Sequence, residues 1–319
     1  MTTAKPVLLQ LLPFPFPEAE QRLTQHFGVI ELWKEPDPDA VLAASKDDIT
    51  VLVTSAMTTT PAELIDKLPN LGAICSNGVG YDAIDVKHAQ KKGIQVSNTP
   101  DVLNDCVADL AFGLLLATAR KLGQAERYVR ADQWGSAVKF PLGVKVSHKK
   151  IGIVGLGRIG MAIAQRAAGF DMEIRYHNRR QRTDVGLAYE PSLIELAAWA
   201  DFLVVATVGG PSTRHLIDQE VLKALGPNGI LINIARGSVI DENALVRALA
   251  NGELGGAGLD VYESEPKVPE ALKTMDNVVI APHIASATTE TRKAMTDLVV
   301  DNVRAFASTG KVITPIPPL

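Results

Sequence analysis

The sequence predicts an α/β protein that contains two parallel β-sheets. Runs of aliphatic and β-branched residues alternate with helical stretches over roughly the first hundred residues, and a second alternation begins at residue 149. Between a strand and a helix of this second region lies the glycine-rich turn "GLGRIG", residues 155–160. Because parallel strands buried on both faces read as continuous apolar runs, each region indicates a sheet with helices on both sides.

The elements of the first region follow from these runs. Strands are expected at 5–12, 49–55, 71–77 and 93–98, and helices at 17–27 and 60–69. A helix over 101–130 comes next, and its first part is apolar on almost all sides, which is typical of a helix buried between domains or at a subunit interface. Residues 131–148 break the pattern and are expected to form a loop or an arm.

The second region has the same architecture without repeating the sequence. Strands are expected at 149–154, 172–178, 201–207, 229–235, 256–261 and 277–283. Helices are expected directly after the glycine turn and at 191–200, 218–225 and 241–252. A long amphipathic helix at 288–310, with glycine at its end, completes the pattern.

Composition excludes several classes of function. A formal net charge of −4 argues against general affinity for nucleic acid or anionic membranes. The two cysteines, Cys75 and Cys106, indicate no disulfide framework, and no Cys/His spacing indicates a metal site. The longest nearly apolar run, 110–119, is too short to span a bilayer, and no signal-peptide pattern is present. We therefore expect a cytoplasmic protein without membrane or nucleic-acid partners.

The glycine turn has the G-x-G-x-x-G spacing of a dinucleotide site, and its strand–turn–helix context makes that interpretation specific. Gly155 would permit the tight turn, Gly157 the approach of a pyrophosphate, and Gly160 close packing of the helix on the strand. The helix N-terminus would supply N–H groups and a positive dipole end for phosphate. The alternative is a glycine turn of an α/β domain with no ligand.

The next strand ends in "RYHNRR", residues 175–180, where an acidic residue would normally bind the ribose hydroxyls and repel a 2′-phosphate. Here Asn178 carries no charge, and Arg179 and Arg180 can form charge-assisted bonds to phosphate. The sequence thus predicts a preference for NADPH, with NADH as the other cofactor to be considered. The alternative is a solvated basic loop.

Four ionisable residues follow later strands of the same region. Arg236 lies just past one strand, Asp260 at the end of the next, Glu265 in the loop after it, and His283 past the last. Ligands of open α/β sheets bind outside the carboxyl ends of strands, so this set beside a nicotinamide cofactor indicates redox chemistry on a carbonyl. Taken singly, the histidine is more often structural, the arginine could form a surface ion pair, and the glutamate could be a turn residue.

The chain resembles the D-isomer-specific 2-hydroxyacid dehydrogenases over nearly its whole length. The matching stretches are "NGVGYDAIDV", "NTPDVLNDCVADLAFGLLLA", "GIVGLGRIG", "INIARGSVIDENAL", "GAGLDVYESEP" and "APHIASAT". Within the family it looks most like the NADPH-dependent glyoxylate/hydroxypyruvate reductases, including the plant hydroxyphenylpyruvate type. The resemblance implies an α/β fold of two Rossmann-like domains, one flavodoxin-like and one dinucleotide-binding, with a cleft between them.

The resemblance also implies residue roles. Arg236 would hold the keto oxygen and carboxylate of a 2-oxo acid, and His283 would protonate the developing alkoxide as hydride arrives. Glu265 would orient His283 and favour its protonated form, Asp260 would hold the nicotinamide carboxamide, and the N–H groups of Val79 and Gly80 would bind the substrate carboxylate. Cofactor contacts are implied for Gly155, Leu156, Gly157, Arg158, Ile159, Gly160, Asn178, Arg179, Arg180, Thr207, Ile234, Ala235 and Asp260.

In this family the domains are not sequential. Residues 1–100 and 285–319 would form the substrate-binding domain and residues 101–284 the dinucleotide-binding domain. An arm at about 120–147, carrying Trp134 and Phe140, would form a homodimer. The turn "TVGGPST" at 207–213 departs from the proline-containing turn usual over the adenosine, so that wall is expected to differ in shape.

The resulting hypothesis is an NADPH-dependent reductase of small 2-oxo acids, glyoxylate and hydroxypyruvate, that makes D-2-hydroxy acids. A reductase of a larger 2-oxo acid, such as 2-ketogluconate or an arylpyruvate, is the alternative within the class, and Met57, Val79, Trp134 and Phe140 could line its pocket. A non-enzymatic NAD(H)-sensing protein is the alternative outside it, although such a protein need not keep the set of Arg236, Glu265 and His283.

Overall fold

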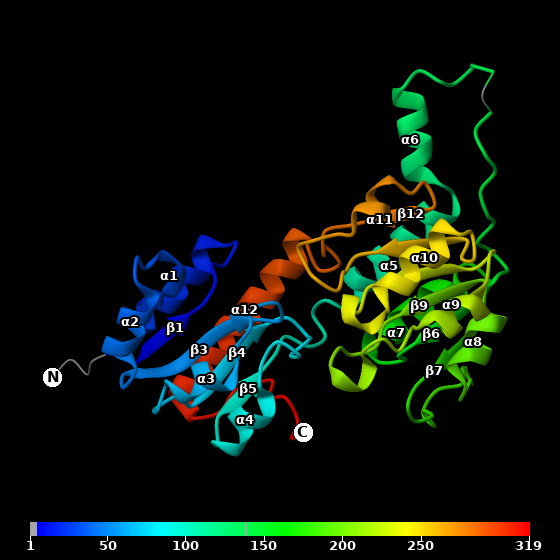
Figure 1. Cartoon of the computed structure of the whole chain (residues 1–319). Helices are drawn as coiled ribbons and strands as arrows, with labels where there is room; N and C mark the ends of the chain where they lie inside the picture. The colour runs from blue at the N-terminus through cyan, green and yellow to red at the C-terminus, as the bar shows by residue number, and fades with distance from the viewer. Residues whose placement is uncertain (1–4, 138) are drawn as a thin grey trace. The chain divides into compact units, whose positions relative to one another are not determined.

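The chain divides into two compact units (Figure 1). Unit 1 joins the residues up to Leu103 with Ala287–Leu319, and unit 2 comprises Asn104–Ser286. The structure is a computed structural model that describes residues 5–137 and 139–319. Val138, which belongs to the expected arm, lies outside the described residues.

Unit 1 contains a five-stranded sheet in the order β2-β1-β3-β4-β5, and all of its neighbouring strands are parallel. This is the strand order of the flavodoxin-like fold. The strands are β1 (Val7–Gln10), β2 (Gly28–Glu31), β3 (Ile49–Ser55), β4 (Ala73–Asn77) and β5 (Gln95–Ser97). The helices are α1 (Pro17–His26), α2 (Pro38–Ser45), α3 (Ala62–Asp66), α4 (Val86–Lys91) and α12 (Thr289–Thr309), with a 3-10 turn at Leu32–Lys34.

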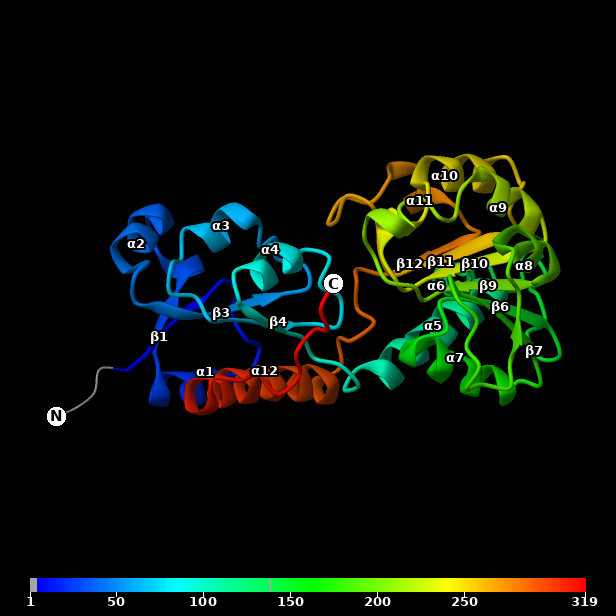
Figure 2. The ribbon, with the colours of Figure 1, turned by 90° about the horizontal axis from the view of Figure 1, so that it is seen from below.

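Helices cover both faces of this sheet. Figure 2 shows α2, α3 and α4 on one face and α1 and α12 on the other. Alternate residues of the strands serve the two sides: Leu52 and Ile74 pack in one apolar cluster with Ile65 of α3, whereas Val51 and Cys75 pack in the other with α1 and α12. The C-terminal helix is thus part of the N-terminal sheet's core, which explains why the chain must return to unit 1.

Unit 2 contains a seven-stranded parallel sheet in the order β12-β11-β10-β9-β6-β7-β8. Its strands are β6 (Lys150–Val154), β7 (Glu173–His177), β8 (Ala188–Tyr189), β9 (Phe202–Val205), β10 (Ile230–Asn233), β11 (Gly256–Leu259) and β12 (Val278–Ile280). Its first strand, β6, lies between β7 and β9, so the winding reverses there. This switch point is where doubly wound sheets bind dinucleotides.

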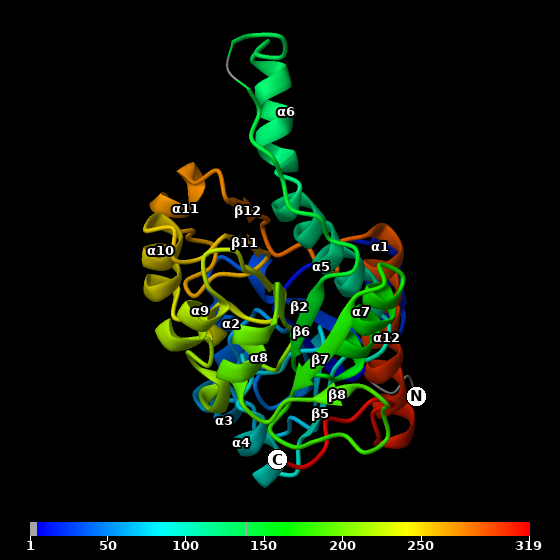
Figure 3. The same ribbon diagram turned by 90° about the vertical axis from the view of Figure 1, so that its right-hand side faces the viewer.

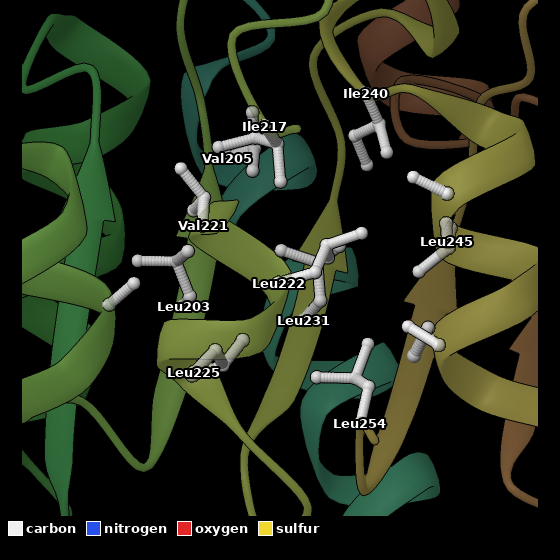
Figure 4. Close-up of a cluster of buried hydrophobic side chains, with 14 of the residues drawn as sticks. Leu203, Val205, Ile217, Val221, Leu222, Leu225, Leu231, Ile240, Leu245 and Leu254 are labelled. Atoms are coloured by element: carbon white, nitrogen blue, oxygen red, sulfur yellow. The ribbon is translucent and has the colours of Figure 1, made fainter. Parts of the chain in front are cut away.

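The helices of unit 2 cover both faces of its sheet, except for one that projects from the unit. They are α5 (Asn104–Ala119), α6 (Leu122–Arg130), α7 (Arg158–Ala168), α8 (Leu193–Trp199), α9 (Gln219–Leu225), α10 (Glu242–Ala250) and α11 (Glu270–Thr274), with 3-10 turns at Pro211–Thr213 and Gly237–Val239. On one face α8, α9 and α10 pack on the sheet through side chains such as Leu203, Leu222, Leu231 and Leu245 (Figure 4). On the other face α5 packs against α7 and the strands β10 and β11.

The predicted fold class is confirmed, with two parallel sheets and helices on both faces of each. The strands expected from apolar runs are all present, with shifted ends. Five short elements were not expected: β2, α2, α4, β8 and α11. The edge strand β2 shows why, because none of its four residues is buried and it therefore lacks the apolar run that marks a central strand.

The single helix expected over 101–130 is wrong, since the chain forms two helices there. Lys121 between them adopts a left-handed conformation with φ of +54°. The N–H of Val144 donates to the carbonyl oxygen of Ala119 at 2.7 Å, and a Cβ on Gly143 would lie 2.8 Å from that oxygen. The returning chain therefore satisfies the end of α5, a tertiary contact that the helical pattern does not contain.

The segment 120–147 projects from unit 2. Figures 1 and 3 show α6 and the chain that returns from it standing clear of the sheet and the other helices of this unit. No residue of α6 is buried, while Trp134 is 81% and Leu142 is 94% exposed. An edge-on ring contact between Tyr128 and Phe140, with centroids 5.4 Å apart, joins the two limbs. None of the helices in the described ranges combines the length and hydropathy that a membrane span requires.

Candidate active site

Two glycines of the turn between β6 and α7 are required by the protein's own packing. Gly155 has φ of +100°, and a Cβ there would lie 2.7 Å from Cα of Thr207. A Cβ on Gly160 would lie 2.2 Å from the carbonyl oxygen of Gly155. Gly155 therefore lets the turn after β6 pass close to Thr207, which follows β9, and Gly160 seats α7 against this turn, as their positions in the motif predict.

Gly157 differs from both. It is exposed, its φ of −83° suits any residue, and a Cβ there would meet no protein atom within 4 Å. No protein atom requires glycine at this position. The space that a side chain would fill is therefore open to a group outside the polypeptide. Gly157 is also the N-cap of the 11-residue helix α7, without a side chain to cap it, so the first N–H groups of the helix are suited to phosphate. These residues fit a dinucleotide pyrophosphate.

The other expected cofactor residues lie around this turn and the neighbouring strand ends. Arg158 is exposed, Ile159 and Thr207 are half-buried, and Ile234 and Ala235 are 7% and 6% exposed. The N–H of Ile234 donates to Val205 at 3.3 Å, which holds the end of β10 beside β9. The two strand ends therefore share one edge with the glycine turn.

Asn178 bonds the glycine turn directly. The N–H of Leu156 donates to Oδ1 of Asn178 at 2.7 Å. Since only the amide oxygen can accept this bond, the other end of the side chain is the NH₂ group, a donor. Arg179 and Arg180 beside it are exposed, and no carboxylate of the described residues forms an ion pair with either of them. The strand end therefore presents donors and positive charge in place of a carboxylate.

Arg182, which the sequence interpretation overlooked, anchors this loop. Its Nη1 donates to the carbonyl oxygen of Leu156 at 3.1 Å, and its Nε donates to Oδ1 of Asp184 at 3.0 Å. Its backbone is held by Tyr176, whose hydroxyl accepts from the N–H of Arg182 at 2.9 Å. The signal was present as a third arginine in "NRRQR", but only the fold shows that it folds back onto the glycine turn.

The histidine past β12 forms a close pair with the glutamate after β11. Nδ1 of His283 lies 2.8 Å from Oε2 of Glu265, and Oε1 of Glu265 accepts the N–H of Tyr262 at 3.0 Å. Burial acts to raise the pKa of Glu265, but the bonds from His283 and Tyr262 and the charges of His283 and Arg236 outweigh it and lower the pKa. The carboxylate holds the proton of the ring on Nδ1 and leaves Nε2 for chemistry.

Arg236 is positioned by the turn after β10. The side chain of Asn233 bonds both the N–H of Ala235 and the carbonyl oxygen of Arg236, each at 3.0 Å. Gly237 follows, and a Cβ there would lie 1.8 Å from the carbonyl carbon of Tyr262. This glycine lets the arginine loop approach the loop that carries Glu265, so Arg236 and Glu265 come close enough to interact electrostatically.

Asp260 is fully buried at the end of β11, and its two oxygens accept N–H groups of Ile284 at 2.7 Å and Ala285 at 2.9 Å. Its backbone oxygen accepts the N–H of His283 at 2.8 Å, and His283 has φ of +54°. Burial raises the pKa of Asp260, opposed by those two backbone bonds. Asp260 thus holds the loop that carries His283 in shape. Its expected contact with the nicotinamide carboxamide stays a prediction.

A second acidic residue joins three of these loops and was not expected. Oε1 of Glu263 lies 2.7 Å from Nη2 of Arg214 and 3.1 Å from Nε2 of His215, and the N–H of His215 donates to Ser238 at 2.8 Å. The loops after β9, β10 and β11 are thereby tied together. No sequence pattern indicated this pairing, because its members are far apart in the chain.

Val79 and Gly80 lie in unit 1, in the turn after β4. Gly78 before them has φ of +147°, and a Cβ there would lie 2.5 Å from Cβ of Ala56. Both residues are half-buried, and in the part of the chain that the structure describes their N–H groups donate to no protein acceptor. Adjacent backbone donors of this kind suit an anion such as a carboxylate.

Comparison with known proteins places the chain among dehydrogenases. A family model described as D-isomer specific 2-hydroxyacid dehydrogenase, NAD binding domain, matches residues 112–285. The chain is 46% identical over 297 residues to glyoxylate/hydroxypyruvate reductase A of Arabidopsis thaliana, covering 93% of this chain and 95% of that protein. It is 47% identical over 297 residues to hydroxyphenylpyruvate reductase of Plectranthus scutellarioides, with the same coverage of 93% and 95%.

A solved structure is similar over almost the full length. It is the NADPH-dependent glyoxylate/hydroxypyruvate reductase of Sinorhizobium meliloti in complex with NADP and malonate. The TM-score is 0.92 at 44% identity, and the match covers 99% of this chain and 98% of that one.

Proposed function

Since the chain belongs to the D-isomer-specific 2-hydroxyacid dehydrogenase family, we propose that it reduces small 2-oxo acids, chiefly glyoxylate and hydroxypyruvate, to D-2-hydroxy acids with NADPH. The family predicted from the sequence motifs is thereby confirmed, and the chain is an oxidoreductase of that family. The observation that carries the proposal is the pairing of His283 with Glu265, beside Arg236, at the sheet edge where the glycine turn lies.

Each residue of this set has a defined task in carbonyl reduction. The bound nicotinamide supplies the hydride. Arg236 is a permanent cation that binds the carbonyl oxygen and the carboxylate of the 2-oxo acid. Nε2 of His283 donates a proton to the oxygen of the former carbonyl as its negative charge develops. Glu265 keeps the ring oriented through Nδ1, and Asp260 keeps the loop of His283 in place.

The substrate carboxylate is assigned to the N–H groups of Val79 and Gly80. Their lack of protein acceptors within the described ranges supports this role, because a buried or half-buried N–H is costly without a partner. A larger 2-oxo acid, in particular an arylpyruvate, is the second candidate, favoured by the similarity to a hydroxyphenylpyruvate reductase.

The preference for NADPH over NADH rests on the end of β7. Arg179 and Arg180 are exposed cations without a carboxylate partner among the described residues, and the amide of Asn178 turns its donor end away from the glycine turn. A 2′-phosphate accepts from all three, whereas the carboxylate that favours a 2′-hydroxyl is missing. A relative with 44% identity was solved with NADP.

Two further assignments complete the proposal. The projecting segment 120–147 joins two copies of the chain, because it exposes Trp134 and Leu142 to an extent that an isolated chain would not favour. The enzyme works in the cytoplasm, a reducing compartment that suits a chain with only two cysteines in its sequence.

The test is the oxidation of NADPH, followed by absorbance, with a panel of glyoxylate, hydroxypyruvate, 2-ketogluconate and 4-hydroxyphenylpyruvate. The proposal expects the highest kcat/KM for glyoxylate or hydroxypyruvate and a chiral product of D configuration from hydroxypyruvate. A higher value for the aryl acid would assign the chain to the second candidate. No turnover with any 2-oxo acid would exclude an enzyme of this kind.

A further inference from the structure

The loop after β7 contains an arginine that already has an anionic partner. Nε of Arg182 donates to Oδ1 of Asp184 at 3.0 Å, and its Nη2 donates to Oδ2 of the same carboxylate. This two-point contact is the geometry in which an arginine also binds phosphate. Asp184 is exposed, and the bond from Arg182 lowers its pKa, so it is an anion at neutral pH.

The guanidinium of Arg182 and the amide of Asn178 bond the same residue of the glycine turn. Nη1 of Arg182 donates to the carbonyl oxygen of Leu156, and Oδ1 of Asn178 accepts from the N–H of that same Leu156, at 3.1 and 2.7 Å. Leu156 is therefore bonded both to Arg182 and to Asn178, and Asn178 is the residue expected at the ribose of the cofactor. Arg179 and Arg180 lie between them in the sequence.

We propose that Asp184 acts as a built-in competitor of the 2′-phosphate, which limits how strongly the enzyme prefers NADPH to NADH. This inference rests on the proposed function, since it concerns the same cofactor site. Asp184 is a specificity-determining residue because it neutralises Arg182, one of the three arginines in the segment 179–182, and because its own charge repels a phosphate.

Charge and the number of available donors both give Asp184 this role. A guanidinium has five N–H donors, and Arg182 uses one on Leu156 and two on Asp184, which leaves two for a phosphate. With Asp184 ionised, the loop 178–184 has a net charge of +2, and without it +3. A carboxylate beside a 2′-phosphate also repels it, whereas a 2′-hydroxyl carries no charge to be repelled.

The test measures the binding of two adenosine fragments by calorimetry. Adenosine 2′,5′-bisphosphate carries the phosphate in question, and adenosine 5′-monophosphate lacks it. In Asp184→Asn the affinity for the bisphosphate should rise about 2- to 5-fold, the range of an exposed charge pair, and the affinity for the monophosphate should stay within about 1.5-fold. The ratio of kcat/KM values for NADPH and NADH should rise by the same factor.

Two variants isolate the cause. Asp184→Glu keeps the charge and should bind both fragments as the wild type does. In Arg182→Met the further change Asp184→Asn should give a smaller gain, since part of the gain requires the released guanidinium. Asp109→Asn is the matched control, because Asp109 pairs with Arg166 at 2.7 Å in the same unit but far from the glycine turn in sequence, and it should leave both affinities unchanged.

The outcomes separate this inference from the proposal on which it rests. Equal affinity of the wild type for the two fragments would contradict the NADPH preference and overturn both. Tighter binding of the bisphosphate by the wild type, with no gain in a folded Asp184→Asn, would overturn the role of Asp184 alone. A loss of affinity in that variant for both fragments would show that Asp184 only supports the loop, which also overturns the inference.

Discussion

Both oxygens of Glu265 are engaged, one by Nδ1 of His283 at 2.8 Å and the other by the N–H of Tyr262 at 3.0 Å. The backbone bond fixes the carboxylate, and the carboxylate fixes the plane and the tautomer of the imidazole. Nε2 is therefore the ring atom that can exchange a proton with a substrate. His283 itself sits in a left-handed backbone conformation held by Asp260, so the reacting atom is positioned from both the backbone and the ring.

Replacement of His283 by alanine should lower kcat about 10²- to 10⁴-fold, the usual contribution of a general acid, while the dissociation constant for NADPH stays nearly unchanged. Steady-state kinetics and fluorescence titration of NADPH measure the two effects. His215→Ala is the control, because His215 also pairs with a glutamate after β11, Glu263 at 3.1 Å, and should retain most of the turnover. Turnover of His283→Ala near that of the wild type would refute its role.

Glu265→Gln should change the pH dependence of stability in a defined direction. The pKa of Glu265 is lower in the folded protein than its usual value of 4.5, so its ionised form adds stability above that value and loses it as the pH falls through the folded pKa. Urea unfolding should show a stability gap between wild type and variant that is constant near pH 7 and narrows below about pH 4.5. A gap independent of pH would contradict the assignment.

Glu242 provides the control of opposite sign. Burial raises its pKa, so the ionised form costs stability in the folded state and the cost appears as the pH rises. In Glu242→Gln the stability relative to wild type should therefore improve as the pH rises, opposite to the trend for Glu265→Gln.

The sequence predicts well the strands that carry this site, because strand formation depends on local patterns of apolar residues. Apolar runs identify the strands β10, β11 and β12, and parallel topology places their carboxyl ends on one edge. Arg236, Glu265 and His283 each follow one of these runs, so their neighbourhood could be inferred before any coordinates. The distance of 2.8 Å between Nδ1 of His283 and Oε2 of Glu265 could not be inferred from the sequence, because it depends on the geometry of the loops after the strands.

The parts that were missed depend on contacts between distant segments. The break at Lys121 requires Val144 to bond Ala119, and the loop after β7 requires Arg182 to bond Leu156, which lies 26 residues earlier. Helix and loop propensities do not predict such bonds, because each residue involved is also compatible with the conformation expected from the sequence. The bond from the N–H of Leu156 to Oδ1 of Asn178 is of the same kind, and it leaves the NH₂ group of the amide as the donor at this strand end.

The paired variant Arg179→Ala with Arg180→Ala should raise KM for NADPH about tenfold and KM for NADH less than twofold. Loss of a charge-assisted bond to a phosphate costs about 1.5 kcal/mol at an exposed site, which corresponds to about a tenfold change in affinity. Kinetics with both cofactors and a saturating 2-oxo acid provide the measurement. Since the two residues are exposed, folding should not change. An equal effect on both cofactors would show that the pair does not bind the 2′-phosphate.

The glycines of the turn should respond differently to alanine. Gly157→Ala should fold as the wild type does, since its Cβ meets no protein atom, yet raise KM for both cofactors because the pyrophosphate is common to them. Gly160→Ala should reduce the free energy of unfolding by about 1–3 kcal/mol, because its Cβ would lie 2.2 Å from the oxygen of Gly155. Urea unfolding and cofactor titration distinguish the two. A stable Gly157→Ala with unchanged KM values would contradict the pyrophosphate contact.

Leu142→Ser should weaken the proposed dimer. Leu142 is 94% exposed on the projecting segment, and a two-fold interface would bury it twice, once from each chain. Burial of two leucines is worth about 3–6 kcal/mol, so the dimer dissociation constant should rise about 10²- to 10⁴-fold, as measured by sedimentation velocity over a dilution series. Val208→Ser is the control, because Val208 is 67% exposed in the same unit but outside the segment 120–147. A wild-type chain that sediments as a monomer, or a variant with an unchanged dimer, would exclude this segment as the site of association.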